Sequence, residues 1–143
     1  MSFVGRDVRK MRVMIDTNIL YSTFFFPNSK ISKMVDFVQA NHHLVLCKYV
    51  INEMIDLATE DYEHLLKDLY VYINTITDEV FEMEGFKNNN YPTMRDPKDV
   101  DVLVNAIESE VDILITGDKD FEDIKVDKPR ILKPREFMDE YMG

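Results

Sequence analysis

Two short apolar runs in this chain each end at an acidic residue. Val13-Met14-Ile15 is followed by Asp16, and Ile113-Leu114-Ile115 is followed by Thr116-Gly117-Asp118. Such runs are typical of buried parallel strands, and open α/β folds place their ligand sites beyond the carboxyl ends of those strands. A lone acid after a strand is as often a helix cap as a ligand. Two acids on separate strands therefore favour a functional site at one edge of a parallel sheet.

Amphipathic helices alternate with such strands along the chain. Apolar residues three and four apart predict helices around residues 31–38, 50–58, 65–76 and 97–107, and a last helix over 134–141. Further short strands are expected at 43–47, 79–86, 111–116 and 130–132, and residues 21–27 form an aromatic, irregular segment. Residues 59–61 are expected to end one helix and cap the next. The alternation predicts an α/β fold with a small, mainly parallel sheet.

Length and charge narrow the class of protein. The 143 residues suit a single domain, with residues 1–10 as a short extension before a domain at 11–143. We expect no membrane span and no signal peptide, and a single buried thiol at Cys47 fits the reducing cytoplasm. The net charge of −10 opposes a broad basic surface for nucleic acid, so any such contact must be local or metal-mediated.

A third acid, Asp99, follows a strong helix start. Asp96 and Pro97 occupy the cap and the first helical position, and Asp99 lies three to seven residues before Val102, Leu103 and Ala106 on the expected inward stripe. Favourable charge at a helix N-terminus is the alternative role for Asp99. An acid that only stabilises the helix N-terminus does not have to lie on the inward stripe, so we favour Asp99 as a residue of the site. Asp101 points elsewhere and is the fallback.

A fourth acid, Glu53, lies at the edge of an apolar helical stripe. By pattern alone such a residue is usually solvated, since an unpaired buried carboxylate is very unfavourable. If Asp16, Glu53, Asp99 and Asp118 converge, their repulsion calls for a cation, and Mg²⁺ or Mn²⁺ suits an all-oxygen site. The histidines lack zinc-binding spacing, and no glycine-rich phosphate or dinucleotide motif is present.

The order of these motifs resembles the PIN domain family. The resemblance rests on Val13–Leu20, Glu53, Arg95–Asp99 and Ile115–Phe121, and it covers about residues 11–141. The closing segment, Arg130–Phe137, resembles the toxin branch of that family, the VapC-like ribonucleases of toxin–antitoxin systems. The combination of motifs is specific, although each one alone is weak.

The resemblance implies a three-layer α/β/α sandwich and metal-dependent cleavage of RNA. Asp16, Glu53, Asp99 and Asp118 match the family's catalytic, metal-binding acids, and we expect Asn18 and Thr116 to orient them by hydrogen bonds. Many relatives carry two adjacent acids where this chain has Asp99-Val100, followed by Asp101. The resemblance also implies a cytoplasmic protein, a cognate antitoxin as partner and a homodimer.

Several neighbouring side chains have two interpretations. Arg95, Lys98 and Lys119 either contact the substrate phosphates or merely offset nearby acids. The aromatic run Phe24–Phe26 either stacks RNA bases or packs within the protein or against a second copy. Asp120 is a weaker candidate for the acidic site and is expected instead to cap the turn before Phe121.

Three other functions fit parts of the pattern. The segment 117–123 echoes the late acidic motif of haloacid dehalogenase-like phosphatases, but those need an acid two residues after the first Asp, where this chain has Asn18. A phosphorylation receiver domain would need an acidic pair after the first strand, and none is present. A catalytically inactive PIN scaffold that binds protein stays open.

Overall fold

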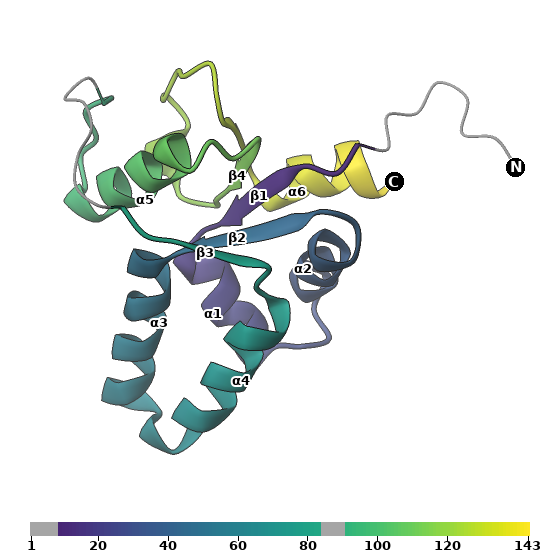
Figure 1. The fold of residues 1–143 in the computed structure, drawn as a ribbon, viewed down its shortest axis with the longest axis vertical. Coiled ribbons are helices and arrows are strands. Elements are labelled where there is room, and N and C mark those ends of the chain that lie inside the picture. The colour runs from purple at the N-terminus through teal and green to yellow at the C-terminus, as the bar shows by residue number, and fades with distance from the viewer. Residues whose placement is uncertain (1–8, 84–90) are drawn as a thin grey trace, which may run out of the picture.

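A single parallel sheet forms the centre of the computed structural model, which describes residues 9–83 and 91–143 (Figure 1). Within those residues the sheet has five strands: β1 (Arg12–Ile15), β2 (His43–Cys47), β3 (Glu79–Phe81), β4 (Ile113–Ile115) and β5 (Arg130–Leu132). The helices are α1 (Thr17–Phe25), α2 (Lys30–Asn41), α3 (Lys48–Asp61), α4 (Leu66–Ile76), α5 (Pro97–Glu108) and α6 (Pro134–Phe137). Shorter turns of helix are η1 (Glu63–Leu65), η2 (Lys119–Phe121) and η3 (Met138–Met142).

The strand order creates a reversal of direction between β1 and β4. The order is β3-β2-β1-β4-β5, with every pair parallel. The chain moves outward from β1 to β3 and then crosses back through α5 to place β4 on the other side of β1. Because such crossovers are right-handed, the two directions put helices on opposite faces, with α1, α3 and α4 on one side and α5 on the other (Figure 1). The predicted parallel α/β sandwich is thus confirmed.

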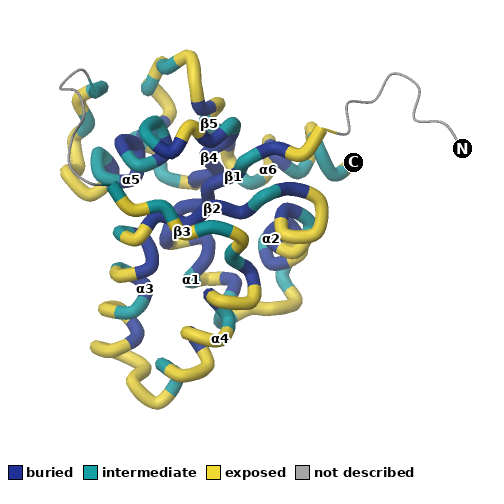
Figure 2. The backbone as a smooth tube through the Cα atoms, in the orientation of Figure 1, coloured by how far each residue is buried: buried dark blue, intermediate teal, exposed yellow. Residues whose placement is uncertain are grey.

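The central strands are buried on both faces. Every residue of Val13–Ile15, Leu44–Cys47 and Ile113–Ile115 is almost inaccessible to solvent, which explains why these segments are continuous apolar runs rather than alternating ones. Figure 2 shows that burial concentrates on the sheet and the inward helix faces, whereas the connection between α3 and α4 is exposed. Phe137 of α6 completes the core against Phe37 of α2.

Two helices begin where their capping residues predict. The Asp96 side chain accepts a hydrogen bond from Lys98 N at 3.0 Å, with Pro97 in the first turn. Ser29 caps α2 in the same manner through Ser32 N. These caps satisfy amide groups that no carbonyl of the helix can reach.

The prediction that residues 21–27 are irregular is wrong for residues 21–25, which belong to helix α1. Helix α1 runs to Phe25 because Ile19, Leu20 and Thr23 share one buried face, so the helical spacing outweighs the low helix propensity of the aromatics. Tyr21 and Phe25, four residues apart, pack edge to face with ring centroids 5.0 Å apart.

Other helix and strand boundaries differ from the predicted ones by a few residues. Residues 59–61 belong to α3, and Tyr62 rather than an acid precedes the next turn. Strand β3 ends at residue 81, and residues 84–86 of the expected strand lie outside the described residues. The last helix changes to a wider turn after Phe137. Of the expected extension at 1–10, residues 1–8 also lie outside the described part.

The single cysteine and the lengths of the helices agree with what the composition predicts. Cys47 is a free, buried thiol whose burial raises its pKa to about 11, so it packs as a small apolar side chain. Among the described residues, no helix is both long and apolar enough to cross a bilayer.

We expect Leu114→Ala to lower the free energy of unfolding by about 2–5 kcal/mol, because it opens a cavity in a fully buried strand. Val80→Ala on β3 is the control, since Val80 is 51% exposed, and it should change stability by less than about 0.5 kcal/mol. Urea unfolding followed by circular dichroism measures both. Equal losses in the two variants would contradict the burial of β4.

Candidate metal centre

Asp16 lies at the carboxyl end of β1, where the direction of the sheet reverses. Its backbone N–H donates to the carbonyl of Ile115 at 3.0 Å, so the pairing of β1 with β4 sets its position. The side chain caps α1 by accepting from Thr17 N through Oδ1 at 2.6 Å. Only 8% of the residue is exposed. The strand end at a topological switch point is where open α/β sheets bind ligands.

The Thr116 hydroxyl joins the two acids that follow β1 and β4. It donates to Asp16 Oδ2 at 2.7 Å and accepts from Asp118 N at 3.2 Å. Burial raises the pKa of Asp16, and the bonds from Thr116 and Thr17 oppose that rise, while the Asp118 charge adds to it. A single side chain therefore holds the Asp16 carboxylate and the backbone of Asp118.

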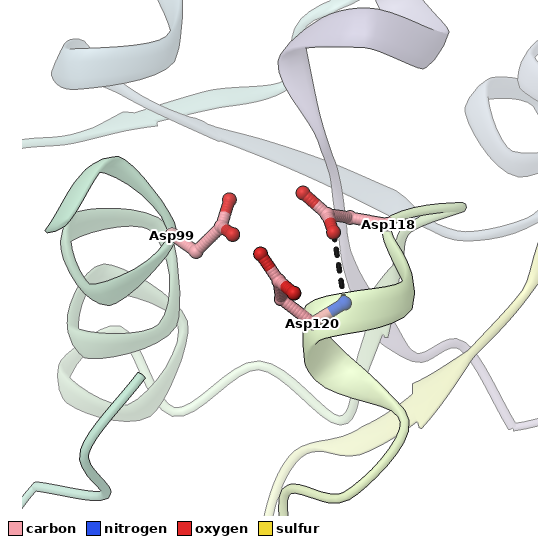
Figure 3. Close-up of side chains that lie close together, drawn as sticks. All are labelled: Asp99, Asp118 and Asp120. Atoms are coloured by element: carbon pink, nitrogen blue, oxygen red, sulfur yellow. Dashed lines mark hydrogen bonds between the residues drawn. The ribbon is translucent and has the colours of Figure 1, made fainter. Parts of the chain in front are cut away.

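Asp99 projects from the first turn of α5 toward the turn after β4 (Figure 3). One carboxylate oxygen from each of Asp99, Asp118 and Asp120 lies within 4.8 Å of the other two. Asp99 is 8% exposed, and its Oδ2 is buried with no hydrogen-bond partner. Burial, with the charges of Asp118 and other nearby acids, raises the pKa of Asp99 to about 7. The arrangement is unfavourable without a proton or a cation.

Asp120, only a weaker candidate by sequence, is a full member of this cluster. We expected it to cap the turn before Phe121, and that expectation is wrong, because Asp118 is the cap and accepts from Asp120 N at 2.8 Å (Figure 3). In the tight η2 turn the two carboxylates, two residues apart, both face α5. The Asp-Lys-Asp spacing was the available signal. Residues two apart would also share a face in an extended segment, so the spacing itself allowed both carboxylates to face α5.

Glu53 reaches the site from α3 by a different link. The Thr17 hydroxyl donates to Glu53 Oε1 at 2.7 Å, so Glu53 adjoins Asp16 through the first residue of α1. Glu53 is half-buried and does not belong to the group of three acids within 4.8 Å. The four expected acids are thus divided into Asp99 with Asp118, and Asp16 with Glu53, with Thr116 joining the two pairs.

The three closely spaced side chains offer carboxylate oxygens, and donor sets of this kind suit Mg²⁺ or Mn²⁺ better than softer metals. The unpartnered Oδ2 of Asp99 and the three closely spaced acids fit a divalent cation.

Comparison with known proteins settles the family. The family model described as PIN domain matches residues 12–120, which include all four expected acids. The chain belongs to the PIN domain family. A search of curated proteins finds no match.

A solved structure resembles this PIN domain in fold. The match is to a chain in the crystal structure of VapBC2 from Rickettsia felis bound to a DNA fragment from their promoter. It has a TM-score of 0.63 and 11% identity, and it covers 86% of this chain and 98% of that chain. The family resemblance seen in the sequence motifs is confirmed by the family model, which places the chain in the PIN domain family rather than among the haloacid dehalogenase-like phosphatases.

The fallback residues lie apart from the acidic cluster of this PIN domain. Asp101 borders a separate hollow against Lys48 and Tyr49 of α3. Asn18 is exposed, and no side-chain hydrogen bond from it to the acids occurs among the described residues. Thr17 takes the bridging role toward Glu53 that sequence reasoning did not foresee.

The candidate substrate-binding residues differ in their exposure and in their distance from the acids. Arg95 has an 86% exposed side chain and pairs with Asp120 at 3.0 Å, while Lys98 and Lys119 are exposed nearby. Phe24 packs against Tyr72 and Phe25 against Tyr62, which leaves Phe26 exposed. These aromatics lie at the far end of α1 from Asp16, about 13 Å along a helix that rises about 1.5 Å per residue. That placement disfavours a stacking platform at the acids.

We expect Asp99→Asn to stabilise the metal-free protein at pH 8 by roughly 1 kcal/mol or more. Asp99 has a raised pKa, so folding takes up a proton between the ordinary 3.8 and about 7, and stability falls as pH rises through that window. The gain should therefore vanish near pH 4. Mg²⁺ should stabilise the parent more than the variant.

Asp101→Asn on the same helix is the matched control for this prediction. It removes the same charge outside the cluster and should show neither the pH-dependent gain nor the altered response to Mg²⁺. Thermal melts with and without Mg²⁺ at pH 4 and 8 measure all three proteins. Identical behaviour of the two variants would argue against the cluster around Asp99.

We expect Thr116→Val to lower the free energy of unfolding at pH 8 by about 1–3 kcal/mol, since Asp16 Oδ2 loses its donor in a buried setting. The loss should shrink as the pH falls through the raised pKa of Asp16, because a protonated carboxyl needs the donor less. Thr116→Ser keeps the hydroxyl and should restore most of the stability. A loss that is independent of pH, or that persists in the Ser variant, would point to packing instead.

Proposed function

We propose that this PIN domain is a divalent-metal-dependent ribonuclease that hydrolyses RNA phosphodiester bonds. The observation that carries the proposal is the buried Asp99 carboxylate, which faces Asp118 and Asp120 with an unpartnered oxygen. Such a group is strongly unfavourable unless a cation offsets its charge. Its place at the switch point of a PIN domain fits catalysis better than a structural role.

Asp16, Asp99 and Asp118 are the proposed metal ligands, with Asp120 as an added one. Mg²⁺ or Mn²⁺ bound here would supply activation of a water molecule and offset the charge that builds on the scissile phosphate. Asp16 is held by Thr17 N and the Thr116 hydroxyl, which leaves its carboxylate little freedom to rotate. Rigid ligands of this kind keep a site in its reactive geometry before the substrate arrives.

Glu53 has a separate proposed role. Its Oε1 accepts from Thr17, and the other oxygen has no side-chain partner among the described residues, so it is available to a water or an ion. Because Glu53 lies outside the tight group of three acids, we assign it to position the attacking water and accept its proton.

Substrate binding needs a local source of positive charge. The chain carries a net charge of −10, so a phosphate approaches the acids only where a metal or a basic group offsets them. Arg95 is the best placed, because its guanidinium already contacts Asp120 of the cluster and is otherwise exposed. Exchange of Asp120 for a phosphate on Arg95 would couple RNA binding to the metal site.

The toxin role is the second part of the proposal. Its support is the closing segment at Arg130–Phe137 and the fold shared with a chain of the VapBC2 complex. A cognate antitoxin, a homodimer and a cytoplasmic location follow from this assignment.

The parent protein should cleave a panel of single-stranded and structured RNAs with Mg²⁺ or Mn²⁺ and lose cleavage on addition of chelator. Asp16→Asn and Asp99→Asn should each lower the rate by at least about 100-fold, because each removes a charged ligand. Asp101→Asn should retain activity. Gel analysis of end-labelled RNA measures the rates.

Equal activity in the parent, Asp16→Asn and Asp99→Asn would reject the assigned site. Absence of cleavage in the parent across the panel would favour an inactive PIN scaffold. A generic aryl phosphate should remain intact, and its hydrolysis would revive the phosphatase alternative.

A further inference from the structure

A pocket of about 290 Å³ opens beside the acidic cluster and shares two residues with it, Thr116 and Asp118. Its remaining walls come from the loop that follows η2 and from residues 129–133 of β5 and its flanks. The loop projects from the sheet between β4 and β5 (Figure 1). None of the proposed catalytic steps uses this space, yet its wall includes an acid of the metal site.

The pocket runs along the free edge of the sheet. Strand β5 is an edge strand, and Arg130 N and Leu132 O bond toward β4. Ile131 alternates with them, so its backbone N–H and C=O point outward, and no hydrogen bond among the described residues uses them. Residues 129–133 all line the pocket, so we infer that the outward N–H and C=O of Ile131 are its backbone donor and acceptor.

The side walls are apolar and the rim is charged. Ile124, Val126 and Ile131 are each half-buried in the wall. On the rim, Lys133 Nζ lies 2.7 Å from Glu122 Oε1, and both side chains are about half exposed. Because such an exposed ion pair is weak, the Lys133 ammonium can leave Glu122 and contact a phosphate instead.

We propose that this pocket holds the nucleotide next to the scissile phosphate of a single-stranded RNA. The base lies between the apolar walls and bonds the free edge of Ile131, while its phosphate contacts Lys133. This inference rests on the proposed ribonuclease function. A strand-like peptide is a poorer occupant, because a volume of about 290 Å³ suits one nucleotide rather than several extended residues.

The pocket also favours particular bases. Glu122 and Glu136 line it and are hydrogen-bond acceptors only. Glu136 Oε1 already accepts from Lys133 N at 2.8 Å, so Glu122, once Lys133 contacts a phosphate, is the acceptor for a base. Carboxylates accept from exocyclic amino groups such as cytosine N4, whereas uracil presents carbonyl oxygens at the corresponding position. Cytidine is therefore preferred over uridine at this subsite.

Binding of free nucleosides tests the pocket without any cleavage. Cytidine and uridine, which carry no phosphate, are titrated into the metal-free parent labelled at isoleucine and valine methyl groups. We expect chemical-shift changes at Ile124, Val126 and Ile131, larger for cytidine. Unchanged shifts at these three methyls, or larger changes elsewhere, would overturn the proposal whether or not the protein cleaves RNA.

Cleavage kinetics supply an independent test. An RNA that the parent cleaves is compared with copies that lack one base on either side of the cut. Loss of the pocket base should slow the parent about tenfold. Val126→Trp fills the pocket and should bring the ratio of the two rates close to one, whereas the exposed control Val71→Trp on α4 should keep it.

A second variant guards against misfolding of Val126→Trp. Lys133→Gln changes an exposed side chain and should raise KM about three- to tenfold with little change in kcat, since it removes a phosphate contact rather than a catalytic group. The same base-removal ratio in the parent and in folded Val126→Trp, or an unaltered KM in Lys133→Gln, would reject the subsite. If the parent cleaves no RNA, the ribonuclease function fails, and the nucleoside titration still decides the pocket.

Discussion

The pairing of β1 with β4 is the constraint on which the rest of the structure depends. Ile15 stands opposite Ile115, and the next amide, that of Asp16, bonds back to Ile115. This register places Asp16 beside Thr116 and brings the turn with Asp118 to the same edge. A slip of one residue would turn Thr116 away from Asp16 and place polar groups in the core. Core packing and site geometry therefore share one register.

The acidic site opposes the stability that the sheet provides. Asp99 is buried beside Asp118 and Asp120, and its pKa near 7 reflects the unfavourable free energy of holding these charges together. Fully buried apolar strands on both faces supply the stabilisation that tolerates this arrangement. The fold thus holds a group of like charges close together, and a cation that bound these carboxylates only in the folded state would stabilise that state.

Much of the fold could be predicted from local patterns, and the failures have physical causes. Apolar runs and helical stripes located all five strands and most helices, and the inward stripe of α5 identified Asp99. Asp120 was ranked lower because Asp favours helix caps, whereas in this turn Asp118 is the cap and Asp120 faces Asp99. The link from Thr17 to Glu53 was missed because it joins segments 36 residues apart, and only the packing of α1 against α3 brings them together.

Thr116 contacts Asp16, Asp118 and the pocket along β5, and only a small side chain with a hydroxyl suits all three. It bonds Asp16 and Asp118, and it forms part of the pocket wall along β5. A larger polar group would intrude on the pocket, and an apolar one would leave a buried carboxylate without its donor. Because the same residue touches both regions, a base seated in the pocket would lie next to the carboxylates that we propose to act on the adjacent phosphate. In that arrangement, the same wall at this edge of the sheet determines which base binds and where the carboxylates lie.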